Sequence, residues 1–395
     1  MGVQKPMRLA MVRCGALKRQ HHLTTLCRYL SDQGFAIEFF SLQAPEREVD
    51  WFGKQVAGLR AHPLGEWSGR GLDRFLKGGL ALRHALKKSD FDLLYVIDSW
   101  TLRYLGVATL GAMRWDKKPL VYHTFDMLAP HVAARSDMLL EGHALRSSDL
   151  NVNADRSRAV LAKALFGLKD VPIDIPVRVL LDEPMPERDM ALRKSLVGNS
   201  PHNPRFMVVC PTGLSGDRLS KEIIHAFAHL PPHYHLITID GGGSYASECR
   251  LLVDKLGLRE RVSILEPMSY EALQRICACA DVGLIFHNAE ASLGNFLCHP
   301  SRLAYFVAMG LPVVANNVPV MEAVIYRHGL GRCCSAYNPE KIASAIEEIC
   351  TGPLPLNDRR QAILTAFRDE LHFEASAARL TTALRRLHHP RADAV

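Results

Sequence analysis

Residues 206–239 read FMVVCPTGLSGDRLSKEIIHAFAHLPPHYHLITI, and this stretch contains the repeating unit of the fold. The apolar run 206–210 predicts a strand, the glycine-containing loop after it predicts a turn, and 221–230 predicts a helix. A second apolar run, 235–239, predicts the next strand. Strands that alternate with helices in this way predict a parallel sheet with helices on both faces.

The same alternation extends along the 395 residues in two series. We therefore expect an α/β protein of two Rossmann-like, doubly wound domains facing a central cleft, with ligands bound at the carboxyl ends of the strands. The first series has expected strands at 8–13, 35–40, 93–97, 120–123 and 150–152 and expected helices at 72–88, 101–113 and 135–147; the second continues with strands at 261–265, 282–286 and 312–315.

A polar, proline-rich passage separates the two series and is typical of a linker. We expect the last helical stretch to pack back on the first domain. The predicted boundaries are 1–180 for the first, acceptor-binding domain, 181–204 for the linker, 205–373 for the second, donor-binding domain and 374–388 for the returning helix.

The composition is that of an ordinary globular protein, with 48% hydrophobic and 23% charged residues. No apolar run approaches the roughly 18 to 20 residues of a membrane-spanning helix. Arg8 and Arg13 interrupt the first apolar stretch, where a signal peptide would have its core, so we expect a cytosolic protein. The ten cysteines are scattered and lack the paired spacing of a zinc site, and we interpret them as reduced thiols.

The net charge of +7 is concentrated in the first half of the chain. Residues 1–180 contain 26 basic and 18 acidic side chains, against 22 and 23 in 181–395. Either the first domain meets an anionic partner, or it has a solvated basic face. The basic, amphipathic stretch 70–88 has two interpretations: an ordinary surface helix weakened by Gly78-Gly79, or peripheral contact with a membrane on its cytoplasmic face. Nucleic acid is not an expected partner, because aromatic residues are not interleaved with these charges.

Two common nucleotide-binding motifs are missing from the expected strand-to-helix loops. The first loop has the single glycine Gly15 where a dinucleotide site needs three, and no P-loop occurs. Gly15 could let the backbone approach a sugar or phosphate, or be a plain turn glycine. The triplet 241–243 has the same two interpretations.

The stretch 298–314 carries the best local signal for an anion site. Ser301 is placed to cap a helix that starts at Arg302, and Gly310 ends that helix before a buried strand. A helix N-terminus beside an arginine suits a diphosphate.

Residues 206–330 resemble the donor domain of the GT-B glycosyltransferases, especially the retaining family-four type. The first domain resembles their acceptor domain more loosely, through Tyr122-His-Thr-Phe-Asp126 and 148–152. The matching passages of the donor domain are Pro211-Thr-Gly-Leu-Ser-Gly-Asp-Arg218 with Lys221, the glycine turn Gly241-Gly242, 262–273, Ala280-Asp-Val-Gly-Leu284, 300–314 and Pro319-Val-Met-Glu322.

One departure from the family pattern concerns the nucleotide ribose. The family has a glutamate five residues before the glycine of this passage, where this chain has Tyr305, and Leu297 replaces a second glutamate. Either the Tyr305 hydroxyl binds the ribose instead, or donor binding has been lost.

The resemblance implies transfer of a sugar from a nucleotide diphosphate, whose departing oxygens need a positive field. We expect Arg218 and Lys221 to supply it, supported by Arg302 and the Ser301 amide, with Gly15, Gly241, Gly242, Tyr305 and Glu322 as further donor-site residues. Glu322 could instead cap the helix that follows it. We find no D-x-D motif placed to hold a metal beside the diphosphate, so we expect no metal and no cofactor besides the nucleotide sugar.

His123 and Asp126 are the two titratable groups of the first-domain loop expected to face the donor sugar. The family places a histidine where this chain has Phe125, so His123 either does that work from a shifted position or simply ends a strand.

The expected function is that of a metal-independent, retaining glycosyltransferase that moves a hexose from a UDP- or GDP-sugar to a hydroxyl acceptor, which could be lipid-linked or anionic. Two alternatives remain open at this point. One is a nucleotide-sugar 2-epimerase of the same fold, and the other is a non-catalytic scaffold that binds sugar nucleotides.

Overall fold

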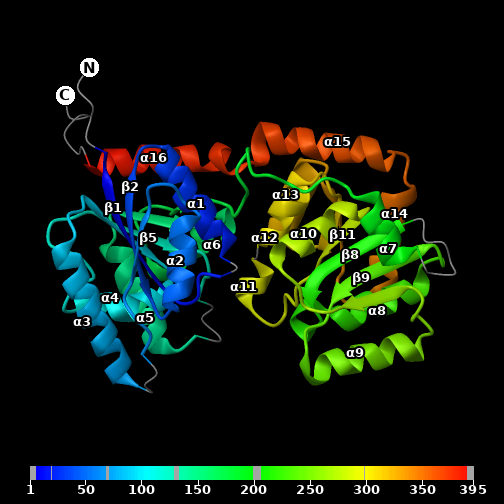
Figure 1. Cartoon of the computed structure of the whole chain (residues 1–395), viewed down its shortest axis with the longest axis horizontal. Coiled ribbons are helices and arrows are strands. Elements are labelled where there is room, and N and C mark those ends of the chain that lie inside the picture. The colour runs from blue at the N-terminus through cyan, green and yellow to red at the C-terminus, as the bar shows by residue number, and fades with distance from the viewer. Residues whose placement is uncertain are drawn as a thin grey trace. The chain divides into compact units, whose positions relative to one another are not determined.

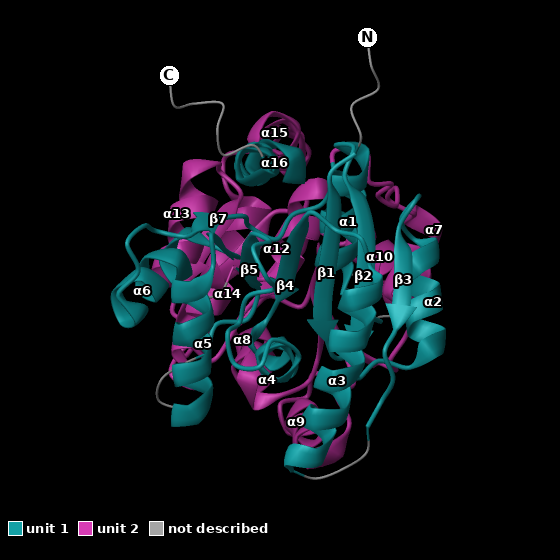
Figure 2. Cartoon of the chain, turned by 90° about the vertical axis from the view of Figure 1, so that its left-hand side faces the viewer, with its two compact units in different colours: residues 1–180, 373–395 teal, residues 181–372 magenta. Residues whose placement is uncertain are grey.

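A computed structural model describes residues 6–18, 20–67, 71–128, 133–198, 206–297 and 299–388. The chain divides into two compact units (Figure 2). Unit 1 comprises residues 1–180 and 373–395, and unit 2 comprises 181–372. Each unit is built around one parallel sheet with helices on both faces, which confirms the predicted α/β class (Figure 1).

The sheet of unit 1 has seven parallel strands in the order β3-β2-β1-β4-β5-β6-β7. The order reverses between β1 and β4, where Leu9 pairs with Ile37 on one side and with Leu93 on the other. The strands are β1 Arg8–Cys14, β2 Ala36–Leu42, β3 Arg60–Pro63, β4 Leu93–Ile97, β5 Leu120–Thr124, β6 Leu150–Asn153 and β7 Ile173–Asp174.

Alternating residues of these strands enter two separate cores. Leu9 and Met11 of β1 join a core on one face, whereas Ala10 and Val12 join the core on the other. Helices α1 His21–Asp32, α2 Glu46–Lys54 and α16 Phe373–His388 contribute to the first core; α3 Leu72–Lys88, α4 Ser99–Ala108, α5 Arg135–Ser147 and α6 Arg156–Phe166 contribute to the second.

Helix α3 runs without interruption through Gly78 and Gly79 because these glycines pack against α4. A Cβ atom on Gly78 would lie 2.6 Å from the Tyr104 ring, and one on Gly79 would lie 2.4 Å from Cβ of Val107. The two glycines therefore allow α3 and α4 to pack closely. The expectation that they weaken the helix did not include this packing role. The expected helix 101–113 ends at Ala108, because Leu110 and Met113 adopt left-handed backbone angles.

Helix α16 brings the end of the described chain back to unit 1. Ala377, Leu380 and Leu384 are fully buried in the first core, and the rings of Phe373 and Tyr29 meet at 5.5 Å. None of the helices in the described ranges combines the length and apolar character needed to cross a bilayer.

The sheet of unit 2 has six parallel strands in the order β10-β9-β8-β11-β12-β13. The strands are β8 Phe206–Gly213, β9 Tyr234–Ile239, β10 Val262–Leu265, β11 Val282–Ile285, β12 Val313–Asn316 and β13 Gly331–Cys334. The helices are α7 Met190–Val197, α8 Ser220–His229, α9 Gly243–Lys255, α10 Tyr270–Cys279, α11 Leu293–Phe296, α12 Ser301–Ala308, α13 Pro319–Arg327, α14 Pro339–Thr351 and α15 Leu356–Ala366. A turn of 3-10 helix, Gly216–Arg218, precedes α8, and a turn of π-helix, Phe367–Leu371, follows α15.

The passage expected as a linker contains helix α7, and an arginine cluster ties it to the sheet of unit 2. Arg193 of α7 and Arg188 before it both bind the carboxylate of Asp281, at 2.7 and 2.5 Å. Asp281, at the start of β11, also accepts the backbone N–H of Met207 from β8 at 2.8 Å. The side chain of Asp281 is only 5% exposed, so these donors offset the cost of burying its charge.

Candidate functional site

The strand order of unit 2 brings together loops that are distant in the sequence. Strand β8 lies beside β11, and the chain order proceeds outward from these two strands in opposite directions. In sheets of this kind, ligands bind outside the carboxyl ends of the strands at such a reversal. The loop after β8 carries Arg218, and the loop after β11 carries His287.

Arg218, His287 and Arg302 meet at this reversal, and we call them the arginine–histidine cluster. Nη1 of Arg218 lies 2.6 Å from Nδ1 of His287, and Nη2 of Arg302, in the first turn of α12, lies 2.7 Å from Nε2 of the same ring. The two predicted arginines are thus brought together by a histidine that the sequence did not single out.

The chemistry of the imidazole limits the hydrogen bonds that this cluster can form within itself. A neutral imidazole has one acceptor nitrogen and one N–H donor, whichever tautomer it takes. Guanidinium groups only donate, so His287 can accept from only one of the two arginines at a time. A bound anion such as a diphosphate could accept hydrogen bonds from both guanidinium groups.

Neighbouring side chains fix the position of His287 and of the loop before Arg218. The Asn316 amide, at the end of β12, accepts the His287 backbone N–H and donates to its carbonyl, both at 2.8 Å. Asp217 accepts from Asn295 of α11 at 2.7 Å and also pairs with Arg218 at 2.9 Å. Three strand ends and two helices therefore hold this cluster.

Lys221 lies outside the cluster. Its ammonium group binds Glu248 of α9 at 2.6 Å and lies 4.8 Å from the centre of the Tyr245 ring. The hydrogen bond to Glu248 raises the pKa of Lys221. Lys221, which we expected at the diphosphate, therefore contacts α9 and not the ring of His287.

The predicted glycines adopt conformations or contacts that larger residues would not tolerate. A Cβ atom on Gly241 would lie 2.3 Å from the carbonyl oxygen of Leu214, so the ends of β8 and β9 approach through this glycine. Gly242 and Gly15 have φ of +70° and +107°. Gly15 follows β1, and its N–H donates to Leu42 at 2.8 Å.

The prediction that Ser301 caps α12 is wrong. The helix begins at Ser301 itself, Pro300 occupies the N-cap position, and no side chain caps this end. A proline that precedes the helix fixes a backbone conformation compatible with helix entry without a side-chain cap. The first amides of α12 lie beside Arg302, so the expected helix N-terminus is present next to the cluster.

Tyr305 and Glu322 differ in their surroundings. Tyr305 packs edge-on against Tyr270 of α10, with ring centres 5.3 Å apart, and burial raises the pKa of Tyr305 to about 12. Glu322 lies in the first turn of α13, and no side chain caps this helix, so the capping interpretation of Glu322 is wrong. In the described part of the chain, no hydrogen bond or ion pair engages the Glu322 carboxylate.

Unit 1 has its own charged pair where its strand order reverses. Nε of Arg13, in β1, lies 3.7 Å from Oδ2 of Asp98, which follows β4. Asp98 has a left-handed φ of +61° and accepts the Phe125 N–H at 2.8 Å. Burial, opposed in part by Arg13, raises the pKa of Asp98 to about 6.

His123 is a buried residue next to this pair. Its Nδ1 lies 2.8 Å from the Tyr95 hydroxyl, and its ring lies 4.1 Å from that of Phe125. Burial lowers the pKa of His123 to about 3, so the ring is neutral at physiological pH and suits hydrogen bonding better than proton uptake. Nε2 of His123 is buried without a hydrogen-bond partner among the described residues, and so is Nε2 of His22 in α1. Asp126 is exposed.

Sequence reasoning missed His287, Asn316, Arg13 and Asp98. Each follows or ends a predicted strand, and a polar residue in that position was the available signal. Which of these loops meet depends on the strand order, which no local pattern in the sequence gives.

This architecture is the GT-B fold, in agreement with the family resemblance. Neither the protein-family models nor the curated proteins include a match to the chain. Solved structures do match: a glycosyltransferase from Rickettsia africae superposes with a TM-score of 0.76 at 13% identity, over 98% of this chain and 100% of that one. Anabaena HepE, in complex with UDP and glucose, superposes with a TM-score of 0.73 at 15% identity, over 96% and 99% of the two chains. Sucrose-phosphate synthase from Thermosynechococcus elongatus gives 0.72 at 15% identity, over 97% and 100%.

Proposed function

We propose that the protein is a metal-independent, retaining glycosyltransferase that moves a hexose from a UDP- or GDP-sugar to a hydroxyl acceptor. The observation that carries this proposal is the cluster of Arg218, His287 and Arg302 at the strand reversal of unit 2. The complex of Anabaena HepE with UDP and glucose, on the same fold, supports the assignment of a nucleotide sugar as the donor.

Arg218 and Arg302 would stabilise the leaving group. Cleavage of the bond between the anomeric carbon and the diphosphate oxygen places negative charge on the diphosphate while the sugar becomes oxocarbenium-like. Two guanidinium groups beside the first amides of α12 supply positive charge where this negative charge develops. We assign Glu322 and the Tyr305 hydroxyl to the ribose or sugar, and Gly241 and Gly242 to the close approach of the backbone.

Unit 1 would bind the acceptor. We assign the acceptor hydroxyl to the carboxyl ends of β4 and β5, where His123 lies within β5 and Asp98 and Asp126 follow the two strands. Asp98, with a pKa of about 6, is ionised at neutral pH and could accept a hydrogen bond from that hydroxyl.

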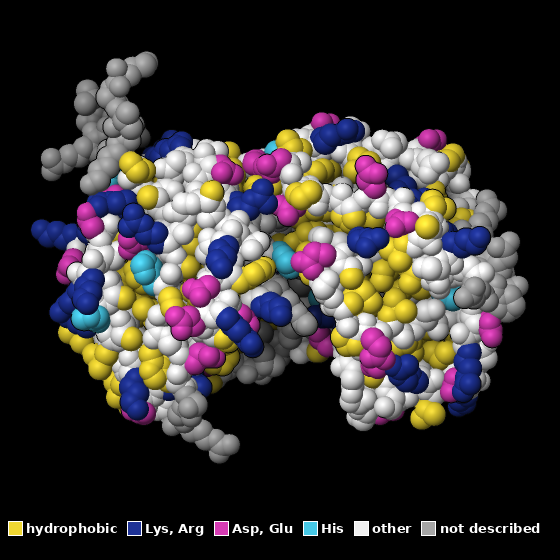
Figure 3. Space-filling view, viewed as in Figure 1, with side chains coloured by type: hydrophobic (Ala, Val, Ile, Leu, Met, Phe, Trp, Pro, Cys, Tyr) yellow, Lys and Arg dark blue, Asp and Glu magenta, His cyan; other side chains and the backbone are white. Residues whose placement is uncertain are grey.

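A membrane-bound acceptor is the finer form of this proposal. Leu72, Leu76 and Leu80 are exposed at one turn's spacing on α3, and the basic residue Lys77 is exposed between the last two. Exposed leucines beside basic residues suit the surface of an anionic bilayer. Elsewhere, the cationic side chains of the face in Figure 3 lie among acidic ones and form no continuous patch. Sedimentation with vesicles that contain phosphatidylglycerol should remove the native protein from the supernatant. The double variant Leu76→Ser, Leu80→Ser should stay in the supernatant.

The proposed function is tested by turnover of UDP- and GDP-hexoses, measured as nucleotide release and by NMR of the sugar product. An α-configured product from an α-configured donor supports retention, and full turnover in EDTA supports metal independence. Arg218→Ala and Arg302→Ala should each lower turnover by roughly 10²- to 10³-fold.

Arg259→Ala is the matched control, because Arg259 pairs with Asp254 on the surface before β10, at the opposite end of the strands. Turnover near the native rate in both cluster variants would refute the role of the cluster. Conversion of UDP-N-acetylglucosamine into its 2-epimer would identify the alternative reaction, and a lack of calorimetric binding to UDP, GDP and TDP would favour a scaffold.

A further inference from the structure

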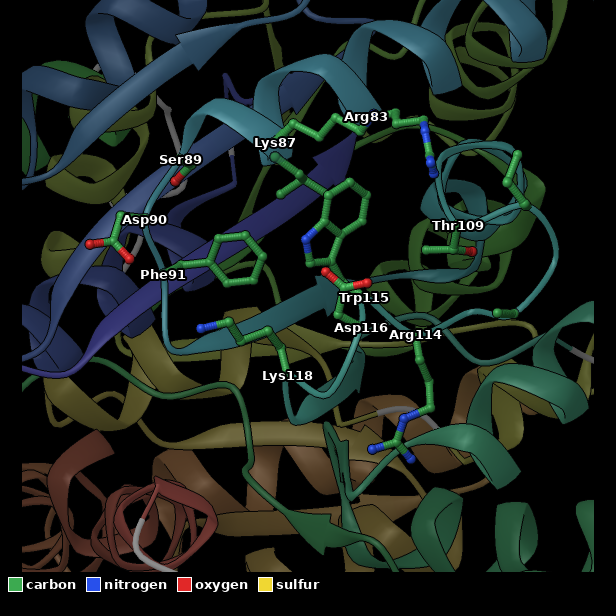
Figure 4. A pocket seen from close by; sticks show the side chains of 13 residues that line it. Arg83, Lys87, Ser89, Asp90, Phe91, Thr109, Arg114, Trp115, Asp116 and Lys118 are labelled. Carbon is green, nitrogen blue, oxygen red and sulfur yellow. The ribbon is translucent and has the colours of Figure 1, made fainter.

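Unit 1 contains a cavity of about 570 Å³ at the amino ends of its strands. It lies between the last turns of α3 and the loop 109–118 that follows α4, and its lining includes Phe91 before β4 and Lys118 before β5 (Figure 4). The amino ends of parallel strands form the opposite edge of the sheet from Asp98, so this cavity is distinct from the site described above. Its volume is within the range of small-molecule sites, about 300 to 1,000 Å³.

The cavity is lined by an excess of positive charge. Arg83 and Lys87 of α3 and Lys118 of the loop contribute cations, and no carboxylate of the described residues lies within ion-pair distance of any of the three. Arg83 is oriented by a hydrogen bond to the Ala108 carbonyl at 2.6 Å. Of the two acidic residues in the lining, Asp90 binds Arg8.

An aromatic surface accompanies these cations. The Trp115 indole stands among the lining side chains, with Phe91 on one side and Arg83 on another (Figure 4). The Arg83 guanidinium lies 5.8 Å from the Trp115 ring centre, and the Lys118 ammonium lies 5.9 Å from that of Phe91. Trp115 is half-buried, and no acceptor for its indole N–H is found among the described residues.

The loop that carries Trp115 is strained. Leu110, Met113 and Asp116 all have positive φ, between +49° and +56°, although none is a glycine. Of the six non-glycine residues with positive φ in the described ranges, three therefore lie in this one loop. Such residues each cost on the order of 1–3 kcal/mol and concentrate at functional sites, where the surrounding structure holds them.

We propose that this cavity binds a phosphate ester carried on a ring, either a sugar phosphate or a nucleoside phosphate. A phosphate monoester carries a charge of about −1.5 to −2 at pH 7. This charge matches Lys87 and Lys118, which have no carboxylate partner among the described residues, beside Arg83. The ring stacks against the Trp115 face, as sugar and base rings do on aromatic side chains. Asp116, which has no partner among the described side chains, accepts hydrogen bonds from ring hydroxyl groups.

Calorimetry on the full chain tests this site with four probes: glucose 6-phosphate, adenosine 5′-monophosphate, glucose and inorganic phosphate. We expect saturable binding of at least one ester, with glucose and inorganic phosphate at least tenfold weaker. Lys87→Ala and Lys118→Ala should each weaken ester binding by roughly tenfold or more, because each removes a charge-assisted hydrogen bond. Trp115→Leu should weaken it as well, by removing the stacking surface.

Lys88→Ala with Lys117→Ala is the matched control for the two lysine variants. Lys88 and Lys117 are exposed sequence neighbours of Lys87 and Lys118, and they do not line the cavity. This double variant removes the same total charge and should bind the ester within about twofold of the native protein. An equal loss of ester affinity in the control would mean that general surface charge causes the effect, and it would overturn the proposal.

The remaining comparisons identify the ligand and distinguish binding at this cavity from binding at the proposed donor site of unit 2. Preference for glucose 6-phosphate assigns a sugar phosphate, and preference for adenosine 5′-monophosphate assigns a nucleoside phosphate. Binding should persist in the Arg218→Ala, Arg302→Ala double variant, so it does not depend on the proposed function. Loss of binding there, or inorganic phosphate binding as tightly as both esters, or the absence of ester binding at millimolar concentration, overturns the proposal.

Discussion

Arg13 and Asp98 form a buried ion pair, with 3.7 Å between Nε and Oδ2, at the point where the strand order of unit 1 reverses. Two of the three groups in the arginine–histidine cluster follow the strands at the corresponding reversal of unit 2. Both sheets thus place charged groups where parallel sheets bind their ligands. Asp98 combines this position with a pKa near 6, which makes it the best test of the role of unit 1.

Replacement of Asp98 by asparagine should lower turnover by about 10²-fold or more and remove an acidic limb near pH 6 from the rate profile. The carboxylate is the active form in the proposed role, so the native rate should fall as the pH drops through the pKa of Asp98. Asparagine keeps an oxygen that can accept the Phe125 N–H, so the conformation of the loop should not change. Nucleotide affinity, measured by calorimetry, should be unchanged because the proposed diphosphate site is in unit 2.

Asp126→Asn should move that limb to lower pH, since the negative charge of Asp126 raises the pKa of Asp98. An Asp98→Asn variant with native turnover and a native pH profile would exclude a direct role for this carboxylate.

Lys221→Ala should lower turnover less than tenfold, in contrast to Arg218→Ala. Its ammonium binds Glu248 and not the cluster, and an exposed pair of this kind contributes little to stability. Rates of nucleotide release from the two variants, measured side by side, check the difference. A loss equal to that of Arg218→Ala would mean that Lys221 leaves Glu248 to bind the donor.

Glu141→Gln should stabilise the protein at pH 8 by up to about 3 kcal/mol and have little effect at pH 4.5. Burial raises the pKa of Glu141 from 4.5 to about 7. The native state therefore holds a proton that the unfolded chain releases, and this stabilising contribution is lost as the pH rises from about 4.5 through 7. Glutamine keeps an acceptor for the Tyr122 hydroxyl.

Urea unfolding of the two proteins between pH 4.5 and 8 measures this difference in the free energy of unfolding. Glu46→Gln, at an exposed position in α2, should follow the native curve throughout. A constant offset between native and Glu141→Gln curves would contradict the assigned pKa.

Gly79→Ala should destabilise the protein by about 1–3 kcal/mol, although alanine favours a helix over glycine by about 1 kcal/mol. The new methyl group would lie 2.4 Å from Val107 Cβ and 3.0 Å from the Tyr104 carbonyl oxygen, so α3 and α4 must separate. Thermal or urea unfolding measures the effect.

Gly106→Ala in α4 provides the comparison, because its nearest neighbour is the flexible end of Met113 at 3.3 Å. That substitution should be neutral or stabilising. Equal effects of the two changes would mean that the close helix contact is not a constraint.

Asp281→Ala should cost about 3–5 kcal/mol of stability, because it leaves Arg193 buried without its carboxylate. Asp254→Ala removes an equivalent aspartate–arginine pair from the surface, where Arg259 is 75% exposed, and should cost less than about 1 kcal/mol. Guanidinium unfolding of the two variants gives both values. Similar losses would show that burial does not set the strength of the Asp281 pair.

Periodicity in the sequence predicts most elements of the fold because each strand and helix is encoded locally. The helices expected at 72–88 and 135–147 are α3 and α5, with the same bounds. The predicted end of α4, at residue 113, lies beyond the observed end at Ala108. The apolar pattern continues into the loop that follows, where Leu110 has a positive φ. A hydrophobic pattern reports burial and does not report that change in φ.

The candidate site could be predicted only in part. Arg218 and Arg302 were found because each lies in a matched motif at a strand or helix end. His287 was missed because its importance comes from the contact of β8 with β11, which are separated by two strands and three helices in the sequence. Ser301 was assigned as a cap from its residue type, whereas Pro300 already fixes the entry to the helix.

The return of α16 to unit 1 has a consequence for how the protein is made. Phe373, Ala377, Leu380 and Leu384 complete a core whose other buried members precede residue 181. The ribosome therefore synthesises all of unit 2 before it synthesises the last segment of unit 1. Unit 2 is continuous in sequence and can fold during translation. Until α16 is synthesised, the apolar side chains of unit 1 that pack against it stay uncovered. Nascent chains stalled before residue 373 should therefore recruit chaperones through their N-terminal half.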